Sequence, residues 1–127
     1  MAMVTIVAML AIVQFVYFGL KVGQARGKYG IDAPAISGNE HFERHFRVHQ
    51  NTLENLMLLI PGIYAFGYFV SEVWAAGLGV VFIAGRFAYD YLYTKDPEKR
   101  APGVLMSFLP ALALVIGGLI GALLTIF

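Results

Sequence analysis

The sequence predicts an all-α integral membrane protein, a bundle of four transmembrane helices. Of its 127 residues, 59% are hydrophobic and 13% are charged. A soluble domain has about 45–50% apolar and about 25% charged residues, so this chain lies far from that class on both counts. Four apolar segments can be drawn, and each can form all or part of one helix. The length allows a single domain over residues 1–127.

The first apolar segment covers residues 1–20 and is interrupted only by Thr5 and Gln14. It is long enough to span a bilayer, which requires about 20 apolar residues. It lacks the basic start and the small-residue cleavage site of a signal peptide, so we expect it to be retained. We predict a first helix over residues 1–26, ended by the Gly- and Pro-containing stretch 27–38.

The second apolar segment, residues 56–70, is too short to span a bilayer by itself. Its helix must therefore include the polar residues that precede it, and we predict a helix over residues 39–70. Asn39 is a suitable N-cap, because its side chain can accept hydrogen bonds from the free N–H groups of the first turn. Glu40 and Glu43 would favour the positive end of the same helix.

The third and fourth helices are predicted over residues 73–95 and 102–127. Only Ser71 and Glu72 separate the second helix from the third, so these two helices should be antiparallel neighbours. Pro97 and Pro102 delimit the last connection, because proline cannot continue a helix. The fourth segment contains no charged residue.

The cations indicate how the bundle lies in the membrane. The second connection and both termini carry no Lys or Arg, and the positive-inside rule therefore places both termini on the non-cytoplasmic side. We expect an integral multi-pass protein, in a bacterial inner membrane. The cations that flank the first and third connections are Lys21, Arg26, Lys28, Lys95, Lys99 and Arg100.

A polar face is predicted on the second helix. Arg47, Asn51 and Glu54 follow one another at i, i+4 and i+7, which places them on one side of a helix. Charged groups at membrane depth face a bundle interior or a wet cavity, and they mark functional sites. The face offers a guanidinium, a carboxamide and a carboxylate to a ligand. An ion pair between Arg47 and Glu54 that serves structure alone fits the spacing equally well.

Other polar residues have simpler interpretations. Arg86 and Asp90 are four residues apart, and we interpret them as a structural ion pair within the third helix. His41, His45 and His49 also recur every four residues, but no carboxylate clearly converges on them, so we expect no metal. The absence of cysteine excludes thiolate chemistry by the protein itself. A net charge of +1 without a basic run gives no indication of nucleic acid.

Two motifs resemble those of a known family. Residues 42–54 read F-E-R-x-x-R-x-x-x-N-x-x-E, and residues 86–93 read R-F-A-Y-D-Y-L-Y, followed by Arg100, Ala101 and Pro102. Both resemble the signatures of the MAPEG superfamily, the membrane-associated proteins of eicosanoid and glutathione metabolism. The resemblance spans essentially the whole chain and is greatest to the microsomal glutathione transferase and leukotriene-forming branch.

The resemblance implies a homotrimer of four-helix subunits, with one glutathione as co-substrate in each crevice between neighbours. It implies glutathione conjugation to, or peroxide reduction of, a lipophilic electrophile that enters from membrane lipid. Arg100 matches the arginine that stabilises the glutathione thiolate, and Arg26 would reach a glutathione carboxylate from the next subunit. The other positions that would bind glutathione are Arg47, His49, Asn51, Glu54, Tyr89 and Tyr93.

The chain departs from the family pattern at three positions. Gly27 stands where close relatives have a second arginine, and His49 stands where leukotriene-forming relatives have a glutamine. Asn55 replaces a ligand-contacting tyrosine of the same relatives. A non-catalytic scaffold that binds lipid or glutathione is the alternative to an enzyme. A small transporter or channel subunit is disfavoured, because the sequence has no inverted repeat or paired broken helices.

Overall fold

The computed structural model describes residues 1–127 and is helical without strands. Its elements are α1 (Ala2–Tyr29), α2 (Glu40–Phe69), α3 (Glu72–Lys95), a short 3-10 helix η1 (Pro97–Lys99) and α4 (Ala101–Ile126). The predicted all-α bundle is therefore confirmed. The largest difference lies at the end of α1, which continues through Gly27 and stops where Gly30 adopts a left-handed conformation with φ 71°. The N–H of Gly30 then bonds the carbonyl oxygen of Arg26 and closes the last turn.

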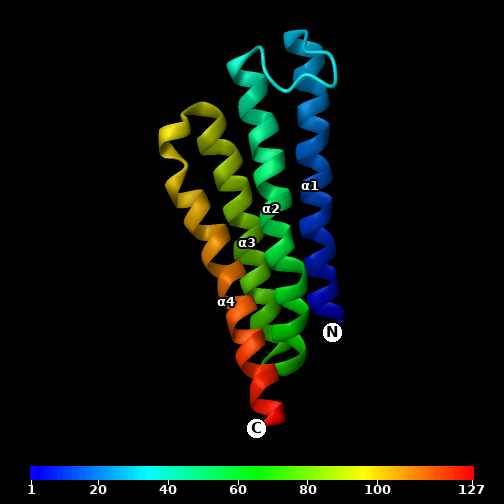
Figure 1. Ribbon diagram of the computed structural model, residues 1–127, viewed down its shortest axis with the longest axis vertical. Helices are drawn as coiled ribbons and strands as arrows, with labels where there is room; N and C mark the ends of the chain where they lie inside the picture. Colours follow the sequence, from blue (N-terminus) through cyan, green and yellow to red (C-terminus); the bar gives the residue numbers. More distant parts are fainter.

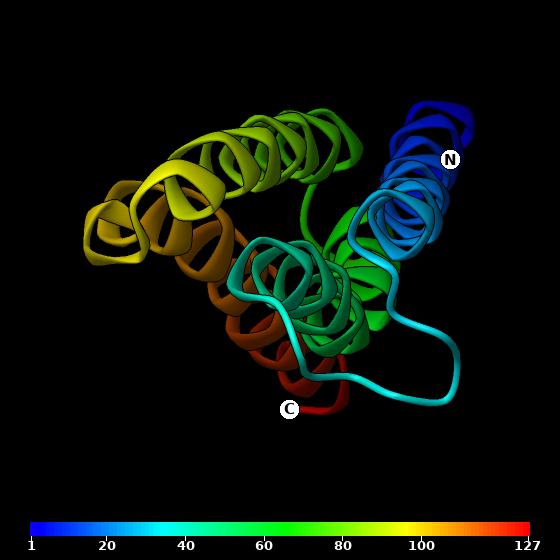
Figure 2. The same ribbon diagram turned by 90° about the horizontal axis from the view of Figure 1, so that it is seen from above.

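The four long helices run up and down along the bundle axis (Figure 1). Both termini lie at one end of the bundle, and the α1–α2 and α3–α4 connections lie at the other. The view along the axis shows α2 between α1 and α4 (Figure 2). Helices α2 and α3 each pack against all three of the other long helices, whereas α1 and α4 make at most slight contact with each other. A side chain on α2 can therefore meet residues from α1, α3 or α4, depending on its face.

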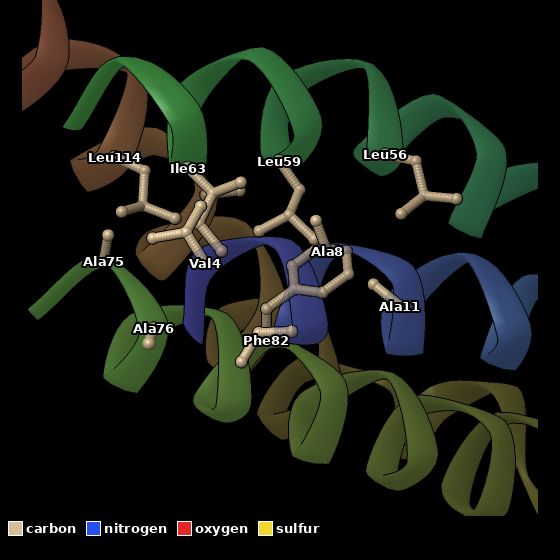
Figure 3. Packing of buried hydrophobic residues seen from close by; sticks show 12 residues of the cluster. Val4, Ala8, Ala11, Leu56, Leu59, Ile63, Ala75, Ala76, Phe82 and Leu114 are labelled. Carbon is tan, nitrogen blue, oxygen red and sulfur yellow. The ribbon is translucent and has the colours of Figure 1, made fainter. Parts of the chain in front are cut away.

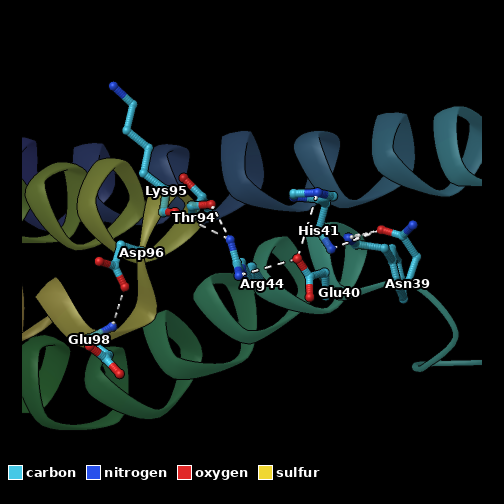
Figure 4. A network of polar contacts seen from close by, with 9 residues as sticks. Asn39, Glu40, His41, Arg44, Thr94, Lys95, Asp96 and Glu98 are labelled. Atoms are coloured by element: carbon cyan, nitrogen blue, oxygen red, sulfur yellow. Dashed lines mark hydrogen bonds and ion pairs between the residues drawn. The ribbon is translucent and has the colours of Figure 1, made fainter.

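Side-chain caps begin two of the four long helices. Asn39 Oδ1 accepts hydrogen bonds from the N–H groups of His41 at 2.9 Å and Phe42 at 3.1 Å, as predicted for an N-cap (Figure 4). Ser71 Oγ accepts a hydrogen bond from the N–H of Trp74 at 3.2 Å and begins α3 directly after α2 ends. This tight turn explains why α2 and α3 are antiparallel neighbours.

The main hydrophobic core lies toward the end of the bundle that carries the termini. Figure 3 shows its packing from close by. Large side chains of α2 and α4, including Leu59, Ile63 and Leu114, are fully buried there. They pack against small residues such as Ala8 on α1 and Ala75 on α3, which allow the helices to approach closely. The polar half of α2 is thereby left at the opposite end, beside the α3–α4 connection.

Three stretches are long and apolar enough to cross a membrane, namely α1, α3 and Pro97–Ile126. Helix α2 has 30 residues, but charged residues occupy much of its first half, so it lies outside that group. As predicted, the short apolar segment is continuous with the polar stretch in one helix. The protein is a membrane-spanning helical bundle whose second helix joins a polar half to an apolar half.

Candidate functional site

Two neighbouring pockets open where α2 faces α3 and α4. The upper pocket, nearer the α3–α4 connection, has a volume of about 330 Å³, and the lower pocket has a volume of about 290 Å³. Asn51 and Val104 line both of them. Since Asn51 lies at the centre of the predicted polar face of α2, that face borders a continuous polar region of the bundle.

The upper pocket collects side chains from α2, α3, η1 and the start of α4. Its residues are Arg47, Asn51, Tyr89, Tyr93, Pro97, Arg100 and Val104. Five of these seven residues are positions that the sequence pattern singled out, although they lie up to 53 positions apart in the chain. The pocket combines two guanidinium groups, one carboxamide and two phenols, which suits an anionic ligand with hydrogen-bonding groups.

The tyrosines are held in place by the packing of α3 on α4. Their rings stack with centroids 5.2 Å apart and an angle of 7° between the planes. Tyr89 is only 3% exposed, and a Cβ atom at Gly103 would overlap its backbone nitrogen and Cα. Only glycine at this position permits so close an approach of α4 to α3.

Arg100 lies between η1 and α4. Its Nη1 atom donates a hydrogen bond to the carbonyl oxygen of Pro97 at 3.0 Å, which orients the side chain across the α3–α4 connection. The residue is exposed, and it forms no ion pair within the chain. Its positive charge is therefore available at the rim of the upper pocket.

The lower pocket continues along α2 into the bundle. Its residues are Asn51, Glu54, Asn55, Leu58, Arg86, Val104 and Phe108. Arg47 Nη1 lies 3.7 Å from Glu54 Oε1, so an ion pair links the two charged members of the polar face. Glu54 supplies an acceptor for a positively charged ligand group, whereas Leu58 and Phe108 make the inner wall apolar.

The prediction that Arg86 and Asp90 form an ion pair is wrong. Asp90 Oδ2 instead accepts a hydrogen bond from Lys21 Nζ of α1 at 2.6 Å. Arg86 turns toward α2 and α4 and bonds three uncharged oxygen atoms. Spacing along one helix indicates which residues can meet, but it does not reveal competing partners on neighbouring helices. A charged residue in an otherwise apolar span was the signal that could have assigned Arg86 to the site.

Arg26 and His49 lie away from both pockets. Arg26 Nη1 donates hydrogen bonds to the carbonyl oxygens of Ala35 at 2.7 Å and Ile31 at 3.5 Å, within the α1–α2 connection. The His49 ring stacks on Phe15 of α1, with centroids 4.3 Å apart. One chain thus brings six of the eight predicted residues to the pockets and leaves these two on the α1 side of α2.

His41, His45 and His49 follow one another at intervals of four residues on α2. No group of three or more His, Asp or Glu side chains is arranged to hold a metal ion. His41 instead packs on Tyr29, with ring centroids 5.7 Å apart, and His49 packs on Phe15. These histidines contact aromatic side chains of α1.

The sequence matches the model of a known protein family. Residues 4–120 match the sequence model of the MAPEG family. The chain belongs to the MAPEG family. The match extends from the start of α1 nearly to the end of α4, so it includes every element that lines the two pockets.

The MAPEG protein is similar to relatives from distant organisms. It is 39% identical over 118 residues to an uncharacterized protein of Synechocystis, covering 93% of this chain and 86% of that protein. It is 40% identical over 117 residues to human microsomal glutathione S-transferase 2, covering 92% and 78% of the two chains. It is 28% identical over 128 residues to bovine leukotriene C4 synthase, covering 87% and 85%.

Proposed function

We propose that this MAPEG protein is a membrane-bound glutathione transferase that presents glutathione as a thiolate to lipophilic electrophiles. The observation that carries the proposal is the meeting of Arg47, Asn51, Tyr89, Tyr93 and Arg100 around one pocket. The similarity to human microsomal glutathione S-transferase 2 supports glutathione as the co-substrate.

The charges of the two pockets complement those of glutathione. Glutathione carries two carboxylates, one ammonium group and one thiol. Arg47 can donate a pair of hydrogen bonds to a carboxylate, and Glu54 can accept from the ammonium group. The tyrosine hydroxyls and the Asn51 amide supply neutral hydrogen-bonding groups around the peptide.

Arg100 is the residue that we assign to the chemistry. A thiolate is the nucleophile, and a positive charge close to the sulfur lowers the thiol pKa below its usual value of about 8.5. The thiol proton is released to water at the membrane surface. The sulfur electron pair then forms a bond to the electrophilic carbon, and the leaving group departs with the electrons of the broken bond. Arg100 stabilises the charge on sulfur before that step.

The position of Arg26 and His49 supports a site shared between subunits. Both residues lie on the α1 side of α2, remote from the pockets of their own chain. In a homotrimer, the α1 side of one subunit can close the pockets of its neighbour and bring Arg26 to a glutathione carboxylate. The molecular mass of the purified protein, corrected for bound detergent, tests this assembly, and a monomer contradicts it.

We also propose that the protein lies in a bacterial inner membrane with the pockets at the cytoplasmic face. Both termini are at the bundle end opposite the α3–α4 connection (Figure 1), and the upper pocket lies beside that connection. Cations flank the α1–α2 and α3–α4 connections, so the end of the bundle that carries these connections and the upper pocket should face the cytoplasm. A reporter fused to the C-terminus should therefore be located outside the cytoplasm. A reporter found in the cytoplasm contradicts this orientation.

A spectroscopic titration tests the enzymatic proposal. Glutathione is added to the purified protein in detergent, and thiolate absorbance is followed against pH. We expect the thiolate signal at distinctly lower pH than for free glutathione, together with conjugation of a generic aryl halide. A peroxide-reduction assay run in parallel measures the second reaction open to the same thiolate. Binding without any shift in the thiol titration contradicts the enzyme and favours the non-catalytic scaffold.

A further inference from the structure

Arg86 is a fully buried cation beside the two pockets, with 0% of its surface exposed. Its guanidinium bonds α2 and α4 through three hydrogen bonds. Nη2 donates to Asn51 Oδ1 at 2.7 Å, Nη1 to Ser107 Oγ at 3.0 Å, and Nε to Thr52 Oγ1 at 3.2 Å. The guanidinium carbon also lies 4.4 Å from the centre of the Tyr89 ring. A single side chain of α3 therefore links the helices that surround the pockets.

The charge of Arg86 has no ion-pair partner within the chain. Asp90, one turn further along α3, pairs with Lys21, and Glu54 pairs with Arg47. The three acceptors of Arg86 are neutral oxygens. An unpaired charge inside a membrane protein is costly, so its retention next to polar pockets favours an anionic ligand as the compensating group.

The hydroxyl acceptors are themselves held in place. Thr52 Oγ1 donates to the carbonyl oxygen of Val48 at 2.7 Å, and Ser107 Oγ donates to that of Gly103 at 2.8 Å. Each hydroxyl hydrogen is thus used within its own helix, which leaves the oxygen lone pairs for Arg86. The guanidinium position follows from contacts to two helices rather than from a flexible side chain alone.

The bond from Arg86 determines how the Asn51 amide is turned. A guanidinium can only donate, so the contact requires the carbonyl oxygen of Asn51 to face Arg86. The same oxygen accepts a second hydrogen bond from Asn55 Nδ2 at 3.2 Å. Asn51 Nδ2 takes part in no hydrogen bond within the chain, and Asn51 lines both pockets. Its NH2 group is therefore left to donate to a ligand.

We propose that Arg86 is a positioning residue of the glutathione site. Arg86 turns the Asn51 NH2 group toward a carbonyl or carboxylate oxygen of glutathione, and its charge favours the bound anion. The proposal rests on the proposed function, because it takes glutathione as the ligand. It assigns Arg86 two separable effects. One is the orientation of Asn51, which acts on affinity, and the other is a positive charge, which acts on ionisation of the bound thiol.

Substitutions of Arg86 separate these effects. Arg86→Gln removes the charge and should lower glutathione affinity about tenfold or more, with the thiolate signal moving to higher pH. Arg86→Lys keeps a charge but replaces the planar fork, so affinity should fall while the thiolate signal stays near its native pH. Calorimetry and thiolate absorbance in detergent measure the two effects. Arg44→Gln is the matched control, since it removes an arginine charge from α2 but Arg44 lines neither pocket, and both measurements should remain near native.

A double-mutant cycle tests whether Arg86 acts through Asn51. In the Asn51→Ala background, Arg86→Gln should lower affinity by a much smaller factor than in the native background. Asn51→Asp leaves Arg86 in place and provides a further test if Arg86 variants do not fold. It keeps an acceptor for Arg86 and removes the NH2 donor, so it should bind glutathione at least as poorly as Asn51→Ala.

Three results overturn the inference. They are native affinity in a folded Arg86→Gln protein, additive losses in the cycle, and native affinity in Asn51→Asp. A native protein that fails to bind glutathione overturns the proposed function as well, whereas native binding with any of these three results overturns the role of Arg86 alone.

Discussion

Arg47 and Glu54 lie two helical turns apart on α2, and Arg47 Nη1 is 3.7 Å from Glu54 Oε1. Their side chains are 53% and 60% exposed, respectively, in the single chain. Ion pairs with this exposure contribute about 0–1 kcal/mol to stability, so this pair is of small value for folding. The same exposure leaves both charges accessible to a ligand in the adjoining pockets. A binding role for the pair, rather than the purely structural one that the spacing also allowed, therefore stays a prediction.

Arg47→Ala should weaken glutathione binding more than tenfold. Bound glutathione would cover this charged hydrogen bond, and losing one partner of such a bond in a complex costs about 2–5 kcal/mol. The melting temperature should change little. Titration calorimetry and thermal unfolding in detergent measure the two quantities. Arg44→Ala is a matched control on the same helix, since Arg44 bonds the carbonyl oxygens of Thr94 and Lys95 and lines neither pocket (Figure 4). Unchanged affinity in a folded Arg47→Ala protein would leave the polar face with a structural role only.

Arg100→Ala should lower the rate of conjugation far more than it weakens glutathione binding. Its charge meets the sulfur fully only when the thiol is ionised, so the loss appears in reactivity. The thiolate signal of bound glutathione should move to higher pH in this variant. Arg100→Lys should recover only part of the activity, because an ammonium group lacks the planar fork of arginine. Equal losses of affinity and rate would make Arg100 a binding residue instead.

Lys21→Met should destabilise the bundle without changing the pockets. Asp90 is 8% exposed, Lys21 is its ion-pair partner, and the second carboxylate oxygen of Asp90 has no hydrogen-bond partner. Removing the lysine leaves the carboxylate unpaired, at a cost of about 1–3 kcal/mol. Asp90→Asn in addition should restore part of this loss, because a neutral amide is less costly to bury. Thermal unfolding measures the effect, and a native melting temperature of Lys21→Met would contradict it.

Gly103→Ala should lower both stability and glutathione affinity. The added Cβ would overlap the backbone of Tyr89, so α4 must move away from α3 and the wall of the upper pocket must shift. Gly77→Ala is the control, because no atom lies within 4 Å of the new Cβ and alanine favours a helix. Unfolding and calorimetry in detergent should distinguish the two variants. Equal behaviour of both would show that the α3–α4 contact tolerates a methyl group.

Several features could be predicted from the order of residues alone, since they depend on local rules. Helices follow from the need to satisfy every backbone polar group in lipid, and Gly30, Asn39 and Pro97 lie at their ends. The polar face of α2 follows from the 3.6-residue period, which places Arg47, Asn51 and Glu54 on one side. The end of α1 was placed three residues early, because Gly27 adopts ordinary helical geometry and Gly30 adopts the left-handed cap.

The partners of each polar side chain were decided only by the tertiary structure. Arg86 and Asp90 have the right spacing for an ion pair, yet Asn51, Thr52 and Ser107 surround Arg86, and Lys21 reaches Asp90. Likewise, the resemblance placed Arg26 at the glutathione of the next subunit and His49 among the binding residues. The single chain holds both on the α1 side of α2, away from its own pockets. The physical reason is that pairing depends on the register and rotation of neighbouring helices, which packing of their apolar and glycine-rich faces determines.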